Sequence, residues 1–257
     1  MWAPIYSDNR KIKYSDFKQI LEGEIPGIVI KKFYSENQCD EILKKIKEYE
    51  ITCFEDSKLE HIGPFLMSYT TRKEKYLDKS KEFQKTTHLI FEKVENPFNR
   101  INKLINLSLP SFSISIARES ERDMSPFVIR VHRKGKSIPI HKDNVNYEGK
   151  EYSIADIEYQ LSCVIHLQES EFGGDVIIYK NKWNRKHEKY RNIDFGYSSQ
   201  VASKESCKIE GIEKGDLVII NPNYFHQVTE ILGEIPRITL GMFLGIYQKD
   251  QRIVVWA

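Results

Sequence analysis

Short apolar runs that alternate with polar residues fill the chain from residue 111 onward, and they constrain its fold more than any other feature. Segments 112–116 and 128–132 alternate in this way, and a period of two is that of a strand with one face in a core. Further runs, separated by glycine and asparagine turns, follow at 161–167, 176–179, 217–220, 227–231 and 238–244. Many short strands predict a double-stranded β-helix, the jelly roll of cupin-like proteins, rather than a βαβ sheet.

The first 110 residues have a different, mostly helical pattern. A short β-prone run at 25–30 precedes Ser35 and Gln38, which have the spacing of a capping box ahead of a helix over 36–49. We therefore expect a mainly β protein with flanking helices, organised as one domain over 1–257. In this organisation residues 1–110 support the jelly-roll core of 111–257 and supply a candidate lid at 55–80, while the long polar segment 181–209 is a second lid candidate.

Two histidines and one aspartate in the β-rich region have the pattern of a metal site. His141 and Asp143 are two positions apart at the end of an apolar run, so on a strand their side chains leave the same face, and Lys142 points away. His226 follows the apolar run 216–220 and completes a set of two imidazoles and one carboxylate. Such a set occupies one face of an octahedron and leaves the opposite positions open, which suits a non-haem Fe(II) oxygenase.

Arg237 and Thr239 follow His226 and share one face of the next predicted strand. A guanidinium fork beside a hydroxyl is well shaped to bind a carboxylate. The order of these residues, His-x-Asp, a distal His and then an Arg, resembles that of the Fe(II)/2-oxoglutarate-dependent oxygenases. The resemblance implies that Fe(II), 2-oxoglutarate and O2 are used, that His141, Asp143 and His226 bind the iron, and that Arg237 with Thr239 binds the far carboxylate of 2-oxoglutarate.

The resemblance extends over roughly residues 110–257. Segments 157–183, 214–218 (Lys-Gly-Asp-Leu-Val) and 241–245 (Gly-Met-Phe-Leu-Gly) are similar to the welwitindolinone-type halogenase branch of this superfamily. Those halogenases have a glycine where this chain has Asp143, and the vacated position holds chloride. With a carboxylate there, we expect hydroxylation of an unactivated C–H bond, with succinate and CO2 as products, rather than halogenation.

Several alternatives stay open. The substrate that we expect is a small molecule such as an amino acid or a natural-product intermediate, but the same chemistry also serves desaturation, ring closure or a peptide target. A jelly roll that holds a metal without turnover is an alternative of another class. Arg130 either faces the barrel interior, where it meets the substrate or a carboxylate, or lies on the surface. His132 and His166 lie in strands outside the motif and are expected to pack or to support ligands.

Composition excludes some functions. A net charge of +2 gives no reason to expect nucleic-acid binding, and no apolar run approaches the length of a membrane span. The N-terminus has no basic segment followed by an apolar one, so we expect a cytoplasmic protein. The 4 cysteines form no Cys-x-x-Cys pair and are expected to be reduced thiols. Nothing in the sequence indicates an oligomeric state.

Overall fold

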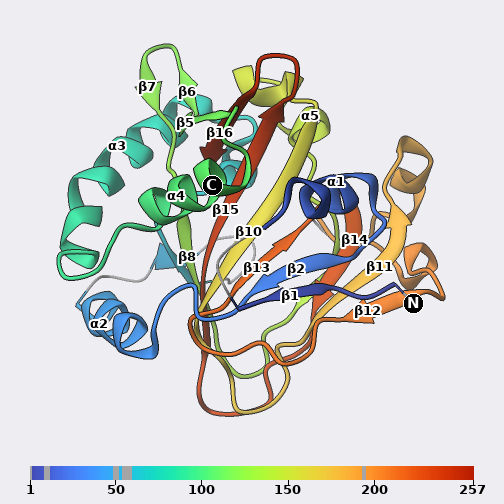
Figure 1. Ribbon diagram of the computed structural model, residues 1–257. Coiled ribbons are helices and arrows are strands. Elements are labelled where there is room, and N and C mark those ends of the chain that lie inside the picture. The colour runs from blue at the N-terminus through green and yellow to red at the C-terminus, as the bar shows by residue number, and fades with distance from the viewer. Residues whose placement is uncertain (1, 9–11, 49–51, 54–59, 193–194) are drawn as a thin grey trace.

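The computed structural model describes residues 2–8, 12–48, 52–53, 60–192 and 195–257 (Figure 1). The helices of this part are α1 (Tyr14–Glu22), α2 (Glu36–Ile46), α3 (Lys73–Ile90), α4 (Pro97–Ser108) and the short α5 (Val145–Glu148). The strands are β1 (Ile5–Ser7), β2 (Gly27–Ile30), β3 (Thr52–Cys53), β4 (Glu60–Ile62), β5 (Ser113–Ile116), β6 (Arg118–Glu119), β7 (Arg122–Asp123), β8 (Val128–His132), β9 (Ile138–His141), β10 (Tyr159–Gln168), β11 (Val176–Lys182), β12 (Ser206–Lys208), β13 (Leu217–Ile220), β14 (Tyr224–Val228), β15 (Arg237–Tyr247) and β16 (Arg252–Trp256).

Among these residues, the strands form two main sheets. The larger, 10-stranded sheet has the order β1-β2-β13-β10-β15-β8-β4-β3, and β16 joins it by pairing with β15 and β5. The smaller sheet has the order β12-β11-β14-β9. In the centre of both sheets, in the orders β2-β13-β10-β15-β8 and β11-β14-β9, neighbouring strands are non-consecutive, as in a jelly roll. The predicted mainly β fold with a double-stranded β-helix core and flanking helices is confirmed (Figure 1).

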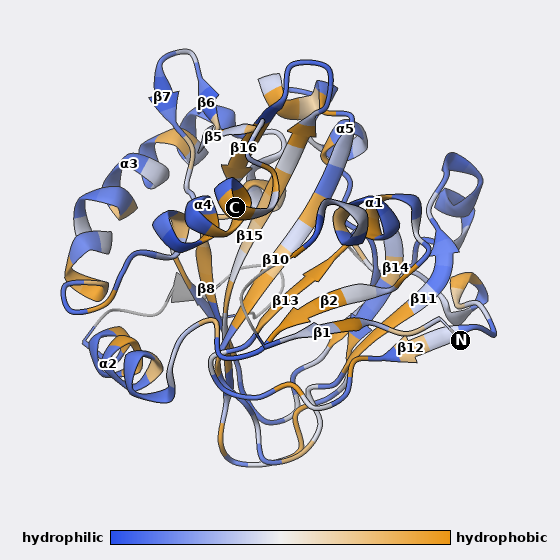
Figure 2. Ribbon diagram, in the orientation of Figure 1, coloured by the Kyte–Doolittle hydropathy of each residue, from blue (hydrophilic) through white to orange (hydrophobic). Residues whose placement is uncertain are grey.

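The larger sheet has two faces of different chemistry because side chains alternate along each strand. On β10, residues 161, 163, 165 and 167 join the main apolar core, and so do residues 238, 240, 242 and 244 on β15. The same core contains the apolar faces of α1, α2, α3 and α4, so the helices cover this face of the sheet. The colours of Figure 2 follow this division, with a largely apolar β13 and with helices that carry both apolar and polar residues. The intervening residues face the smaller sheet.

The helix α2 forms largely as its sequence predicts. The side chain of Ser35 accepts a hydrogen bond from the backbone N–H of Gln38, whose side chain accepts one from the backbone N–H of Ser35. Its apolar stripe, Cys39, Ile42, Leu43 and Ile46, is buried. The helix ends at Ile46, before the predicted end at residue 49.

The bounds of one predicted strand were wrong, and one short strand was not predicted. The strand predicted over 227–231 is β14, Tyr224–Val228, so His226 lies within the strand and not before it. The mostly helical segment 51–110 also contains β4, which pairs with β8 and extends the sheet. Three residues are too few for a period of two to stand out from a polar sequence, and β4 is held in place by its neighbour rather than by its own pattern. No helix in the described ranges is long and apolar enough to cross a bilayer.

Candidate metal centre

Two neighbouring strands bring the histidines of the predicted triad together. β9 and β14 pair in antiparallel fashion, and His141 lies directly opposite His226 in their register. The centroids of the two imidazole rings are 4.1 Å apart. Both side chains therefore leave the same face of the smaller sheet and can approach one ion.

The backbone fixes the direction of both rings. Nδ1 of His141 lies 2.9 Å from the carbonyl oxygen of Pro139, and Nδ1 of His226 lies 2.9 Å from that of Tyr224. Because a carbonyl oxygen only accepts, each Nδ1 carries the hydrogen and each Nε2 keeps its lone pair. This is the tautomer that a metal ligand needs, and the bond also holds the ring in orientation.

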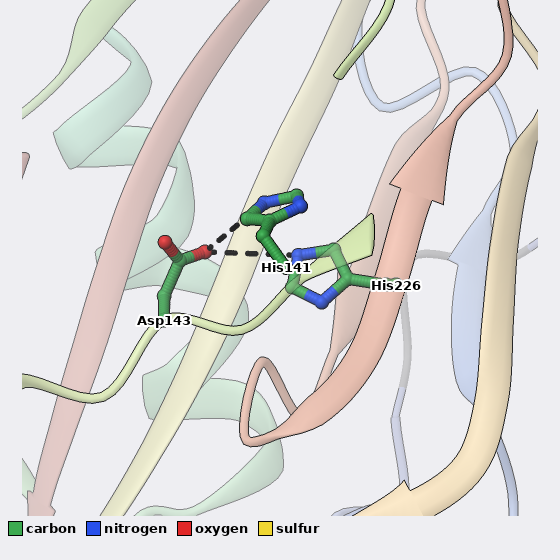
Figure 3. A group of neighbouring side chains, drawn as sticks. All are labelled: His141, Asp143 and His226. Atoms are coloured by element: carbon green, nitrogen blue, oxygen red, sulfur yellow. Dashed lines mark ion pairs between the residues drawn. The ribbon is translucent and has the colours of Figure 1, made fainter. Parts of the chain in front are cut away.

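Asp143 reaches the histidines from outside a strand, so its predicted position on the same strand as His141 was wrong. β9 ends at His141, and the backbone N–H of Asp143 donates to the carbonyl oxygen of Pro222 over 2.9 Å. Its Oδ2 lies 3.9 Å from Nε2 of His141 and 3.7 Å from Nε2 of His226 (Figure 3). The three candidate ligand atoms lie within 4.8 Å of one another, close enough for one ion.

The protonation states suit metal binding. Burial, together with the neighbouring His226, lowers the pKa of His141 to about 4. Burial by itself raises the pKa of Asp143, but the neighbouring His226, His141 and Arg130 lower it to about 2. At neutral pH the site thus holds a neutral His141 and an ionised carboxylate, which are the forms that bind a metal.

A cavity of about 440 Å³ lies beside the triad, between the two sheets. Its size is that of a small-molecule pocket. Its apolar wall comes from both sheets and includes Val164, Val176, Val218, Ile220, Val228 and Phe243. Its polar residues on the larger sheet are Arg130, His132, Ser162, His166, Arg237 and Thr239.

Arg237 and Thr239 share the inner face of β15, as predicted, and both are buried. In the sheet register, Arg237 lies opposite His132 on β8, and Thr239 lies between Arg130 on β8 and His166 on β10. The cation and the hydroxyl therefore face the same cavity as the triad.

Arg130 faces the barrel interior and not the surface, the two positions that the sequence analysis left open. It lines the cavity, its guanidinium carbon is 5.5 Å from the ring centroid of Phe65, and burial lowers its pKa. Among the described residues, no carboxylate lies within ion-pairing distance of Arg130. The negative charge of Asp143 stabilises the protonated form of Arg130.

Both lid candidates contribute residues to the cavity. Phe65, Met67 and Thr70 come from the segment 55–80, of which residues 55–59 lie outside the described ranges. Arg191 and Phe195 come from the segment 181–209, and the Phe195 ring is 5.5 Å from that of His141. This segment also packs Tyr197 and Val201 against Phe225, so it has an apolar cluster of its own. The lining of the cavity thus includes two connecting segments that are distant in sequence.

A buried ion-pair network in the cavity wall was missed by the sequence analysis. Lys142, expected to point away from the site, lines the cavity, because the alternation of a strand no longer holds beyond His141. Its ammonium contacts the carboxylate of Glu148, and it lies 4.5 Å from the ring centroid of Trp183. Glu148 also accepts from Arg191 over 2.9 Å. No local pattern links these three residues. Arg191 belongs to a basic run over 180–191, which contains six lysines and arginines and could attract an anion.

Two histidines and a carboxylate facing the cavity of a jelly roll, with a buried arginine on a neighbouring strand, define an Fe(II)/2-oxoglutarate-dependent oxygenase. The chain belongs to the family of the carrier-protein-independent halogenase WelO5, whose family model matches residues 7–257. The predicted resemblance to this superfamily is confirmed. A search of curated proteins gives no match.

Solved structures share the fold at low sequence identity. An N-substituted L-amino acid dioxygenase from Burkholderia ambifaria AMMD is 13% identical and covers 95% of this chain and 91% of its own, with a TM-score of 0.66. HygX from Streptomyces hygroscopicus, solved with nickel and 2-oxoglutarate, is 11% identical, with 90% and 87% covered and a TM-score of 0.51. The carbocyclase SnoK from nogalamycin biosynthesis is 12% identical, with 90% and 83% covered and a TM-score of 0.51.

Proposed function

We propose that this protein is an Fe(II)- and 2-oxoglutarate-dependent dioxygenase that hydroxylates an unactivated C–H bond of a small molecule. The observation that carries the choice of hydroxylation is the carboxylate of Asp143, whose Oδ2 is 3.7 Å from Nε2 of His226. With three protein ligands, a bidentate oxo acid and dioxygen, an octahedral site is full. A halide has no position in it.

The residues present fit the metal. His141 and His226 offer Nε2 lone pairs held in place by the backbone, and Asp143 offers an ionised carboxylate. Nitrogen and oxygen donors with open positions suit Fe(II). When bound, the iron with 2-oxoglutarate and dioxygen supplies the oxidation that converts a C–H bond to an alcohol and releases succinate and CO2.

We assign the cosubstrate subsite to Arg237 and Thr239. The far carboxylate of 2-oxoglutarate would be an unpaired charge in a largely apolar cavity, and Arg237 is a buried cation on its wall. Within the described ranges, Arg237 has no ion-pair partner, and its buried Nε has no hydrogen-bond partner. A carboxylate from outside the protein would satisfy both needs.

We assign Arg130 to the substrate. It lies between the metal ligand Asp143 and the aromatic ring of Phe65 at the mouth, and its charge is not neutralised by a close carboxylate among the described residues. A small molecule with a carboxylate, such as an amino acid or a natural-product intermediate, fits both this cation and the cavity of about 440 Å³. The shared fold with a dioxygenase of N-substituted amino acids supports this choice.

The first test needs no substrate. Anaerobic protein loaded with Fe(II) is titrated with 2-oxoglutarate while the weak visible charge-transfer absorption of the chelate is followed. We expect saturable absorption, and its absence with iron bound would favour a metal-binding jelly roll without turnover. Turnover is then measured as succinate release with N-acyl amino acids as candidate substrates. The masses of the products are determined by mass spectrometry.

Halogenation is the second candidate, because the family is named for a halogenase. Reactions run in chloride distinguish the two, since hydroxylation adds the mass of one oxygen and halogenation replaces hydrogen by chlorine. Products of desaturation or ring closure would instead lose the mass of two hydrogens. Only the first result supports our proposal.

A further inference from the structure

His132 on β8 is a buried histidine that the proposed chemistry does not use. Its side chain lines the cavity, and the residue is only 1% exposed. In the part of the chain that the structure describes, neither of its ring nitrogens has a hydrogen-bond partner. Buried polar groups in native proteins are nearly always satisfied, so this imidazole needs a partner from outside the protein.

The neighbours of His132 indicate what that partner is. His132 lies directly opposite Arg237 in the sheet register, and Arg237 also has a buried Nε without a hydrogen-bond partner among the described residues. Burial, with the charges of Arg237 and Arg130, lowers the pKa of His132 to about 3. The ring is therefore neutral and carries one N–H donor. A donor beside an unpaired guanidinium fits a carboxylate.

Among the described residues, the carboxylates nearest to this position already have other partners, although the charge of Glu169 also acts on Arg237. Asp216 pairs with the ammonium of Lys31 and accepts from the backbone N–H of Lys32. Glu169 lies 2.5 Å from Nδ1 of His166, so it is already engaged by the other cavity histidine. These contacts leave the carboxylate to the ligand.

His166 has a different role from His132. Because the carboxylate of Glu169 accepts the hydrogen on Nδ1, Nε2 of neutral His166 is an acceptor. An acceptor cannot donate to a carboxylate, although His166 is the register partner of Thr239. Of the two histidines, only His132 is free to donate to an anion.

We propose that His132 donates a ring N–H to the terminal carboxylate of the 2-oxo acid, beside Arg237 and Thr239, and so favours dicarboxylic over monocarboxylic 2-oxo acids. This inference rests on the proposed function, because it takes 2-oxoglutarate as the ligand. It goes beyond the predicted pair of Arg237 and Thr239 by adding a neutral donor from the neighbouring strand.

The test compares two 2-oxo acids of equal length. 2-Oxopentanoate has a methyl group where 2-oxoglutarate has its terminal carboxylate. Binding of each acid to the Ni(II)-loaded protein is measured by calorimetry, and to the anaerobic Fe(II)-loaded protein by absorption. We expect His132→Leu to weaken 2-oxoglutarate about tenfold or more, as for a lost hydrogen bond to a charged group, with little change for 2-oxopentanoate. His132→Gln, which restores a donor, should recover part of the loss.

His61 provides the matched control. It is a buried histidine at 4% exposure on β4, it pairs with Arg130 in the register, and it is not among the residues that line the cavity. His61→Gln should leave the ratio of the affinities for 2-oxoglutarate and 2-oxopentanoate unchanged. Equal losses for both acids in His132→Leu, or no loss, would overturn the inference while leaving the proposed function intact. Failure of the wild type to bind 2-oxoglutarate would overturn both.

A measurement on the wild type covers the case in which His132→Leu does not fold. Histidine-selective ¹⁵N NMR of the Zn(II)-loaded protein, with His132→Gln used for assignment, follows the ring nitrogens directly. We expect 2-oxoglutarate to shift a ring nitrogen of His132 toward the hydrogen-bonded range and 2-oxopentanoate to leave it unmoved. The same shift with both acids would contradict the inference.

Discussion

Gly241 lies against the guanidinium of Arg130. A Cβ atom at position 241 would come within 2.6 Å of Nη1 and 3.3 Å of Cζ of Arg130. Gly241 is on β15, two positions beyond Thr239 on the same strand face. The absence of a side chain at 241 is therefore what allows the charge of Arg130 to lie over β15 inside the cavity.

Gly241→Ala should destabilise the protein through this contact. Overpacking in a fitted interior typically costs about 1–3 kcal/mol. Because the atoms that the new Cβ would meet are the end of a flexible side chain, we expect a loss near the lower end of that range in the free energy of unfolding, measured by urea denaturation. In an Arg130→Met background the same substitution should cost clearly less, because the guanidinium is gone. Equal costs in both backgrounds would show that Arg130 is not what occupies the space.

Asp143→Gly should exchange one chemistry for another. Without the carboxylate, we expect hydroxylation to be lost and a halide to bind in the vacated position. The measurement is the visible spectrum of the anaerobic Fe(II) and 2-oxoglutarate complex, which should become chloride-dependent in the variant and not in the wild type. Asp123→Gly, on the exposed β7, is the matched control. Unchanged hydroxylation by Asp143→Gly would exclude Asp143 as an essential ligand.

Arg237→Leu should lose the cosubstrate but keep the metal. Removing one partner of a buried charge pair costs several kcal/mol, so we expect the affinity for 2-oxoglutarate to fall about 100-fold or more. Iron content should be unchanged, because Arg237 is not a ligand. Arg133→Leu removes an arginine whose side chain is 54% exposed and pairs with Glu60, and it should leave cosubstrate binding unaffected. Equal 2-oxoglutarate affinities in the wild type and Arg237→Leu would exclude the assigned subsite.

The buried His132 should make the protein sensitive to acid. Its pKa is lowered from 6.5 to about 3 by burial and by Arg237, so below pH 6.5 the unfolded chain binds a proton that the folded protein does not. Its contribution to stability is thus complete above pH 6.5 and falls as the pH is lowered from there toward pH 3, by on the order of 1 kcal/mol for each pH unit. His132→Gln should flatten this part of the profile of unfolding free energy against pH. Parallel profiles would show that His132 titrates normally.

The sequence predicts the parts of the site that strands supply. Arg237 and Thr239 lie on a predicted strand whose period fixes the face of each side chain. His226 was found from the order of the motif residues, which resembles that of a known family, because its strand was predicted to begin one residue later. Asp143 was predicted as a ligand, and the structure brings it to the two histidines although it lies beyond the end of β9 and is anchored by Pro222 instead of by strand geometry.

The remaining parts depend on contacts between segments that are distant in sequence. Arg191 reaches Glu148 through the packing of a 3₁₀ segment on the smaller sheet, and a basic run gives no indication of which arginine will be half-buried. That His132 has no partner among the described residues is likewise visible only when the residues of three neighbouring strands are in place. Local periodicity determines the face of a side chain but not its long-range neighbours.

The mouth of the cavity has a consequence for how such a chain diversifies. The triad and Arg237 lie on or beside the sheets, whereas Phe65 and Phe195 belong to connecting segments outside the paired strands. Exchanging those segments changes which molecules enter without disturbing the residues that hold the metal. The substrate range can therefore change while the oxidative reaction stays the same. Replacing the segments that contain Phe65 and Phe195 by those of other family members is a direct route to new substrates.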